Sequence, residues 1–123
     1  MSKKILAVVD DLFFVVKIQD AAKRAGFEAS FLKSEDEAIE SARAERPRLV
    51  IVDLNAKSVK PVQLIERLRA HPDLKGLTVL SFVSHVQGEL KQRAHDAGAN
   101  MVLARSAFST NLPQILKRHA GAF

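Results

Sequence analysis

The stretch Ile5-Leu6-Ala7-Val8-Val9-Asp10-Asp11 joins five apolar residues to two aspartates, and Leu49-Val50-Ile51-Val52-Asp53 repeats this order later in the chain. Short apolar runs that end in polar residues are typical of buried strands. In a parallel α/β sheet, ligands bind at the carboxyl ends of the strands. The two runs therefore predict a crevice that gathers three carboxylates, which repel one another unless a cation lies among them.

Five apolar runs alternate with five amphipathic segments along the chain. The expected strands are Ile5–Val9, Glu28–Leu32, Leu49–Asp53, Leu77–Val83 and Met101–Ala104. The segments that follow them carry apolar residues three and four positions apart, as a helix on a core does. This alternation predicts an α/β fold, a doubly wound parallel sheet of five strands with five helices.

Cap residues support these helix boundaries. Gly98 falls where the fourth helix ends, and Ser34-Glu35-Asp36-Glu37 matches a capping box. Pro61 and Pro113 are expected in first helical turns, where the missing N–H costs little. Pro47 is expected to stop the second helix.

The segment Leu12–Val16 has two interpretations. It is rich in strand-favouring residues and fits the second strand of a hairpin. Helical spacing resumes at Ala22 and Ala25, so we favour a helix with the leucine and valines of this segment on its buried stripe. We expect Phe13 and Phe14 to belong to the core, where one of them can still shield the crevice from water.

The composition indicates one soluble globular domain spanning residues 1–123, with 47% hydrophobic and 27% charged residues. No apolar run approaches the roughly 20 residues of a membrane span, so no membrane association is expected. The absence of cysteine excludes disulfides and fits a cytoplasmic protein. The net charge is +5, but basic residues do not cluster with aromatic ones, so nucleic-acid binding is not expected.

The whole chain resembles the receiver domain of two-component response regulators, a flavodoxin-like fold. Val8-Val9-Asp10-Asp11 matches the first-strand acidic pair of that family, Ile51-Val52-Asp53-Leu54-Asn55 its phosphoacceptor strand, and Ala97-Gly98-Ala99 the motif before its fifth strand. The resemblance implies that Asp53 accepts a phosphoryl group. It also implies a Mg²⁺ site with Asp11 and Asp53 as direct ligands, Asp10 acting through water and the carbonyl of Asn55 completing the set.

Other positions depart from the family pattern. The Ser or Thr that ends the fourth strand corresponds to Val83, unless a shift of one residue brings Ser84 there. Arg105 replaces the fifth-strand lysine, where it can clamp a phosphoryl group or pair with unphosphorylated Asp53. Ser106 replaces the following proline, so we expect a trans Arg105–Ser106 bond. Val102 replaces the switch aromatic residue.

The leading hypothesis is a stand-alone receiver that takes a phosphoryl group from a histidine kinase or phosphotransferase and signals in trans to a downstream protein. The alternatives are a pseudo-receiver that binds proteins without phosphorylation, and a metal-dependent phosphohydrolase, which lacks an evident general base. His85 stands near the expected site, where it can influence phosphoryl chemistry. The stretch 85–119 carries more basic than acidic side chains, which favours an acidic partner; they are Lys91, Arg93, Arg105, Lys117 and Arg118 against Glu89 and Asp96.

Overall fold

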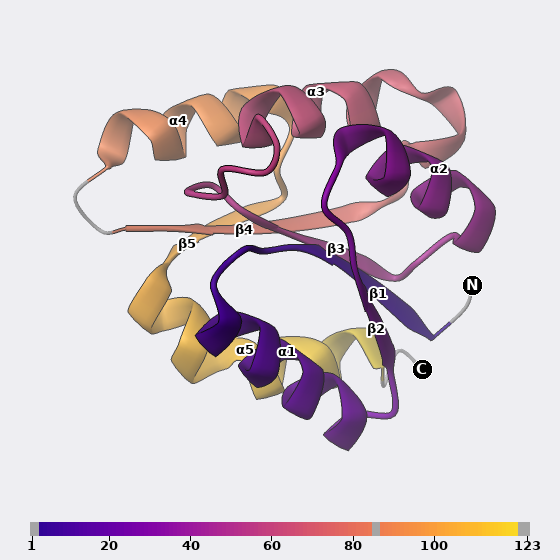
Figure 1. The fold of residues 1–123 in the computed structure, drawn as a ribbon, viewed down its shortest axis with the longest axis vertical. Helices are drawn as coiled ribbons and strands as arrows, with labels where there is room; N and C mark the ends of the chain where they lie inside the picture. The colour runs from indigo at the N-terminus through magenta and orange to yellow at the C-terminus, as the bar shows by residue number, and fades with distance from the viewer. Residues whose placement is uncertain (1–2, 85–86, 121–123) are drawn as a thin grey trace.

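The computed structural model describes residues 3–84 and 87–120, which form alternating strands and helices (Figure 1). The strands are β1 (Lys4–Val8), β2 (Glu28–Phe31), β3 (Leu49–Asp53), β4 (Thr78–Val83) and β5 (Met101–Ala104). The helices are α1 (Leu12–Arg24), α2 (Glu35–Glu45), α3 (Pro61–Ala70), α4 (Gly88–Ala97) and α5 (Arg105–Ala120), with a 3₁₀ turn at Pro72–Leu74. All five expected strands are confirmed to within one residue at each end.

The strands form one parallel sheet in the order β2-β1-β3-β4-β5. Helices α1 and α5 cover one face, and α2, α3 and α4 cover the other (Figure 1). The predicted doubly wound fold is therefore confirmed. Because β1 and β3 are neighbours whose connections run to opposite sides, their carboxyl ends flank the position where such folds bind ligands.

The two faces of the sheet bury two separate apolar cores. Residues of β3 alternate between them, and the whole strand is buried. The core under α1 and α5 contains a group of aromatic rings, with Phe82 and Phe108 stacked at 4.3 Å and Phe14 at 4.9 Å from Phe82. These rings lie at the end of the sheet that carries the aspartates, because Phe82 pairs with Asp53 in the strand register.

Helix α1 confirms the helical interpretation of residues 12–16, but the expected buried stripe is wrong. The buried positions are Phe14, Ile18 and Ala22, each four residues from the last. Leu12, Phe13 and Val16 are exposed, so only one of the two phenylalanines belongs to the core. The large ring of Phe14 fixes this rotation of the helix by packing on the other aromatic rings.

The caps follow the sequence with one exception. The Ser34 hydroxyl accepts the Glu37 amide at 3.1 Å, Pro61 begins α3, and Gly98 caps α4 with a φ of 117°. Pro113 is not in a first turn, because α5 begins at Arg105 and contains the proline inside it. The buried residues Phe108 and Leu112 extend the helical face back toward β5, while the ring of Pro113 faces solvent.

Across residues 3–84 and 87–120, no helix has the length and apolar character needed to cross a membrane.

Candidate phosphoryl and metal site

The three aspartates lie at the carboxyl edge of the sheet, as the sequence predicts. Asp53 is the last residue of β3 and is 2% exposed, while Asp10 and Asp11 follow β1 directly. Val8 of β1 pairs with Val52 of β3, which brings the two strand ends level. The fold therefore gathers these carboxylates, although they do not share one set of contacts.

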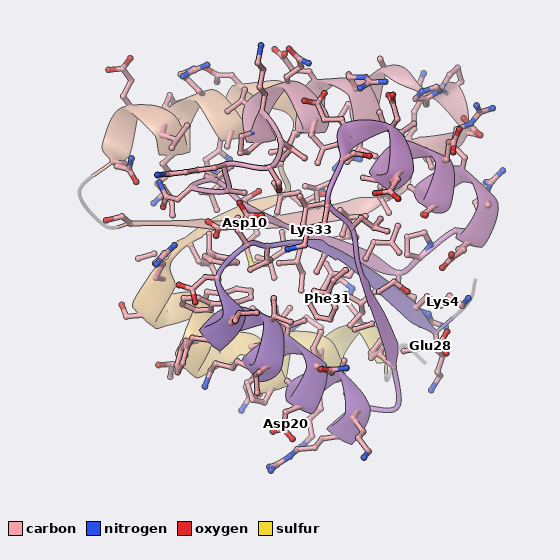
Figure 2. The ribbon with its side chains drawn as sticks, viewed as in Figure 1. Lys4, Asp10, Asp20, Glu28, Phe31 and Lys33 are labelled. Carbon is pink, nitrogen blue, oxygen red and sulfur yellow. The ribbon has the colours of Figure 1, made fainter. Side chains whose placement is uncertain are left out.

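Asp10 turns toward the loop between β3 and α3. Its Oδ2 accepts the amides of Lys57 at 2.6 Å and Ser58 at 3.0 Å, and its Oδ1 accepts the Ser58 hydroxyl at 2.7 Å. The hydrogen bond from the Ser58 side chain is the largest influence on the pKa of Asp10, which lies below its ordinary value despite partial burial. Lys33 lies beside this carboxylate and contributes in the same direction (Figure 2).

Asp11 serves both the helix and the site. Its Oδ1 accepts the Phe13 amide at 2.9 Å and so caps the N-terminus of α1. Its Oδ2 lies 3.8 Å from Nη1 of Arg105. One carboxylate thus joins the first turn of α1 to the cation of the site.

Arg105, the first residue of α5, faces the acids. Its Nη2 lies 3.6 Å from Oδ2 of Asp53, and the guanidinium carbon lies 5.2 Å from the ring centroid of Phe14 and 6.0 Å from that of Phe82. An arginine over an aromatic face is attracted by the ring quadrupole, and its planar group stacks where an ammonium cannot. The Nε atom is buried without a hydrogen-bond partner, so contacts at the other nitrogens and the rings hold this side chain.

Asp53 remains electrostatically unsatisfied despite this cation. Burial is the largest influence and raises its pKa, and the charges of Asp10 and Asp11 add to the effect. The Asn55 amide, which donates to Oδ1 at 2.8 Å, and the Arg105 charge act in the opposite direction without cancelling it. The pKa of Asp53 therefore lies above its ordinary value, and a further cation would favour its ionised form.

The donor atoms suit Mg²⁺, which prefers carboxylate and carbonyl oxygens. Oδ2 of Asp11 and Oδ2 of Asp53 both approach the Arg105 guanidinium, so they already point toward one positive charge. No three histidine, aspartate or glutamate side chains come together as a metal-holding group within the described part of the chain. The contacts of Asp10 with Lys57 and Ser58 explain this, since they direct its carboxylate to the loop.

Asn55 carries contacts that the sequence did not reveal. Its side-chain nitrogen donates to Oε1 of Gln87 at 2.7 Å, and its side-chain oxygen accepts the Ser84 amide at 3.2 Å. These bonds tie the residue after the acceptor strand to both flanks of the β4–α4 connection. Neither they nor the Ser58 contacts to Asp10 had a signal in the sequence, because they join loops 29 to 48 residues apart.

The positions that depart from the family pattern lie on a different face. Val83 ends β4, and its side chain is buried in the core under α2, α3 and α4 together with Val102. Ser84 follows the strand and is half-buried. Ser106 is exposed in the first turn of α5, and the Arg105–Ser106 peptide is trans as expected. His85 lies outside the described residues.

Comparison with known proteins identifies the chain. The family model of the response regulator receiver domain matches residues 5–117. The chain belongs to the response regulator receiver family. A receiver domain is a module of two-component signalling that typically accepts a phosphoryl group rather than acting as a true enzyme.

Relatives of this receiver include a full-length match. The chain is 19% identical over 121 residues to the polar-differentiation response regulator DivK of Brucella ovis, and the match covers 98% of each. It is 29% identical over 69 residues to the regulatory protein PhoP of Bacillus subtilis, of which it spans only 29%.

Solved structures show the same fold. A putative response regulator from Chloroflexus aurantiacus superposes with a TM-score of 0.84 at 25% identity, covering 98% of this receiver and 99% of that chain. The receiver domain of the sensor histidine kinase PA1611 from Pseudomonas aeruginosa, which has a magnesium ion coordinated in its active-site cleft, gives 0.82 at 19% identity, covering 98% and 99%.

The basic side chains expected on one partner face are spread over three places of this receiver. Arg105 faces Asp53. Lys117 lines a groove between α1 and α5, whereas Arg93 lines a groove between α3 and α4. The charge excess of residues 85–119 is therefore not one contiguous patch.

Proposed function

We propose that this receiver accepts a phosphoryl group on Asp53 from the phosphohistidine of a kinase or phosphotransferase. In that step the P–N bond of the donor breaks and a P–O bond to the carboxylate forms. The observation that carries the proposal is the buried acceptor at the sheet edge, faced by a cation at 3.6 Å. An acceptor in this position is shielded from water yet sits beside positive charge, as phosphoryl transfer requires.

The neighbours of Asp53 have separate roles in this proposal. The Asn55 amide orients the carboxylate through Oδ1. The Arg105 guanidinium, already stacked on Phe14, is placed to bind oxygens of the transferred group with two parallel hydrogen bonds. Asp11 holds the other side of that guanidinium and limits its movement.

The same residues would hold Mg²⁺. Asp11, Asp53 and the carbonyl of Asn55 would bind the ion, and Asp10 would act through water, as the family resemblance implies. The ion would supply charge neutralisation beside a phosphoryl group. The magnesium in the receiver of PA1611 supports this choice of ion.

We also infer that the chain acts in the cytoplasm as a stand-alone receiver, which signals in trans to a downstream protein. The match to DivK over 98% of both chains supports this. We propose neither a membrane nor a nucleic acid as its partner, because the site presents carboxylates rather than a basic surface.

The test is phosphorylation from a small donor. The protein is incubated with Mg²⁺ and acetyl phosphate, and intact mass is measured at short intervals for the wild type, Asp53→Asn and the control Asp36→Asn. Asp36 is an exposed carboxylate that pairs with Arg67 on α3, away from the site. We expect a phosphate adduct in the wild type and the control and none in Asp53→Asn. An adduct that survives Asp53→Asn contradicts the proposed acceptor.

A second candidate is a phosphorylation-independent binding module. The observation that favours it is the burial of Val83 and Val102, which leaves neither a hydroxyl nor an aromatic residue at the expected switch positions. Absence of any adduct with intact, folded protein supports this candidate over the first.

A further inference from the structure

Three large apolar side chains stand in solvent on the first turns of α1. Leu12 is 76% exposed, Phe13 65% and Val16 63%, and they are the large hydrophobic residues with such exposure among residues 3–84 and 87–119. Their spacing places them on one side of the helix. A cluster of exposed apolar residues beside a functional site indicates a surface that a partner covers.

Positive charge borders this apolar cluster. Farther along α1, Lys17 and Arg24 line a groove of about 270 Å³ that Lys117 of α5 completes. Asp20 also lines the groove and pairs with Arg24 at 3.3 Å, at the far end of α1 in Figure 2. Three cations against one paired acid favour a partner that carries carboxylates next to its apolar side chains.

A chain of contacts joins the apolar cluster to the phosphoryl acceptor. The Phe13 ring meets the Phe14 ring edge-on at 5.2 Å, and Phe14 carries the Arg105 guanidinium at 5.2 Å. That guanidinium lies 3.6 Å from Asp53 and 3.8 Å from Asp11, whose other oxygen holds the Phe13 amide. A group added to Asp53 must displace or recruit this guanidinium, and both of its supports belong to the start of α1.

The opposite side of the edge offers no comparable connection. Val83 and Val102 are buried aliphatic residues and cannot form hydrogen bonds through their side chains. The described parts of β5, α4 and α5 expose no large hydrophobic side chain. A signal from Asp53 therefore has its most direct physical route through Arg105 and Phe14.

We propose that the exposed face of α1 formed by Leu12, Phe13 and Val16 binds a protein partner with apolar side chains next to carboxylates, and that Arg105 on Phe14 couples this face to the phosphoryl state of Asp53. The coupling rests on the proposed function. Arg105 acts here as a positioning residue, since its contacts carry a change at the acceptor to a separate surface.

Methyl NMR with Mg²⁺ and beryllofluoride, a phosphoryl analogue, tests the coupling. We expect the Leu12 and Val16 methyl signals to shift with the analogue, while Ile39, buried under α2, reports the remote core. Phe14→Leu should reduce the α1 shifts, and Arg105→Lys, which keeps the charge but not the planar stack, should reduce them without disturbing the core.

The outcomes separate the coupling from the function beneath it. Shifts confined to β4, β5 and α4 in the wild type overturn the coupling and leave Asp53 as acceptor. No analogue-dependent shift anywhere, with an intact fold, overturns the proposed function and the coupling with it.

A synthetic helical peptide with leucines along one side and flanking glutamates tests the partner chemistry. Its affinity for the whole protein is measured with and without the analogue. We expect Phe13→Ser to weaken binding roughly tenfold, as loss of an aromatic anchor does. Gln19→Ser, an exposed α1 control, should bind as the wild type does.

A peptide with lysines in place of the glutamates should bind least. Equal binding of both peptides, equal binding by Phe13→Ser, or no binding by the glutamate peptide overturns the proposed surface or its partner chemistry. An affinity that the analogue leaves unchanged overturns the link to Asp53.

Discussion

The acidic corner and the β4–β5 corner lie at the same edge of the sheet but are built from opposite kinds of side chain. Asp11, Asp53 and Arg105 form the first, on the side of α1 and α5. Val83 and Val102 form the second, buried under the helices of the other face. The first can respond to an added charge because its groups are ionic, whereas the second can respond only through packing.

Removing the cation of the acidic corner should have the largest effect. Arg105→Gln deletes a charge-assisted contact worth about 1.5–3 kcal/mol, so adduct formation from acetyl phosphate should slow by roughly 10- to 100-fold. Arg105→Lys restores the charge and should recover part of the rate. Time-resolved intact mass measures both variants.

A faster reaction in Arg105→Gln would reverse the role of this residue. It would mean that the guanidinium competes with Mg²⁺ for Asp11 and Asp53 rather than assisting transfer. Mg²⁺ titrations of the same variants would then show tighter binding on loss of the arginine.

Giving the β4–β5 corner a hydroxyl tests whether the comparison depends on Val83. Val83→Thr buries a hydroxyl among apolar residues, so the free energy of unfolding should fall by about 1–2 kcal/mol. Beryllofluoride offers that hydroxyl an acceptor and should recover part of the loss. Urea unfolding with and without the analogue provides the measurement.

Val83→Ala is the matched control, because it removes methyl groups and adds no hydroxyl. Its stability loss should stay the same with the analogue. A recovery equal to that of the threonine variant would show that the position does not reach the phosphoryl group.

Loosening Asp10 should have the smallest effect. Ser58→Ala removes the hydroxyl that accounts most for the lowered pKa of Asp10, so the unfolding free energy should fall by about 0.5–1 kcal/mol at pH 7. The folded pKa lies below the ordinary value of 3.8, so this stabilisation is complete above 3.8 and is lost as the pH falls through the folded pKa. Urea midpoints of wild type and variant should therefore converge in acid.

The same substitution should strengthen Mg²⁺ binding, because it frees Oδ1 of Asp10 from the loop. Unchanged Mg²⁺ affinity would mean that the Lys57 and Ser58 amides alone keep this carboxylate away from the ion.

Much of the acidic corner was predictable from local patterns. A run of four large aliphatic residues such as the one in Leu49–Asp53 is stable only when buried, so the aspartate that follows it marks the end of a strand. The rotation of α1 was not predictable in this way. Leu12–Val16 is apolar all round, and only the packing of Phe14 against Phe82 and Phe108 decides which residues face outward.

The sequence by itself determined the sheet, its helices and the edge where the aspartates emerge, because apolar periodicity and caps act over a few neighbouring residues. Only the tertiary structure decided what each aspartate contacts. Ser58 reaches Asp10 across 48 positions, and Arg105 reaches Asp53 only once β5 and α5 are in place. Such contacts depend on how distant loops and rings pack, and no local pattern records that.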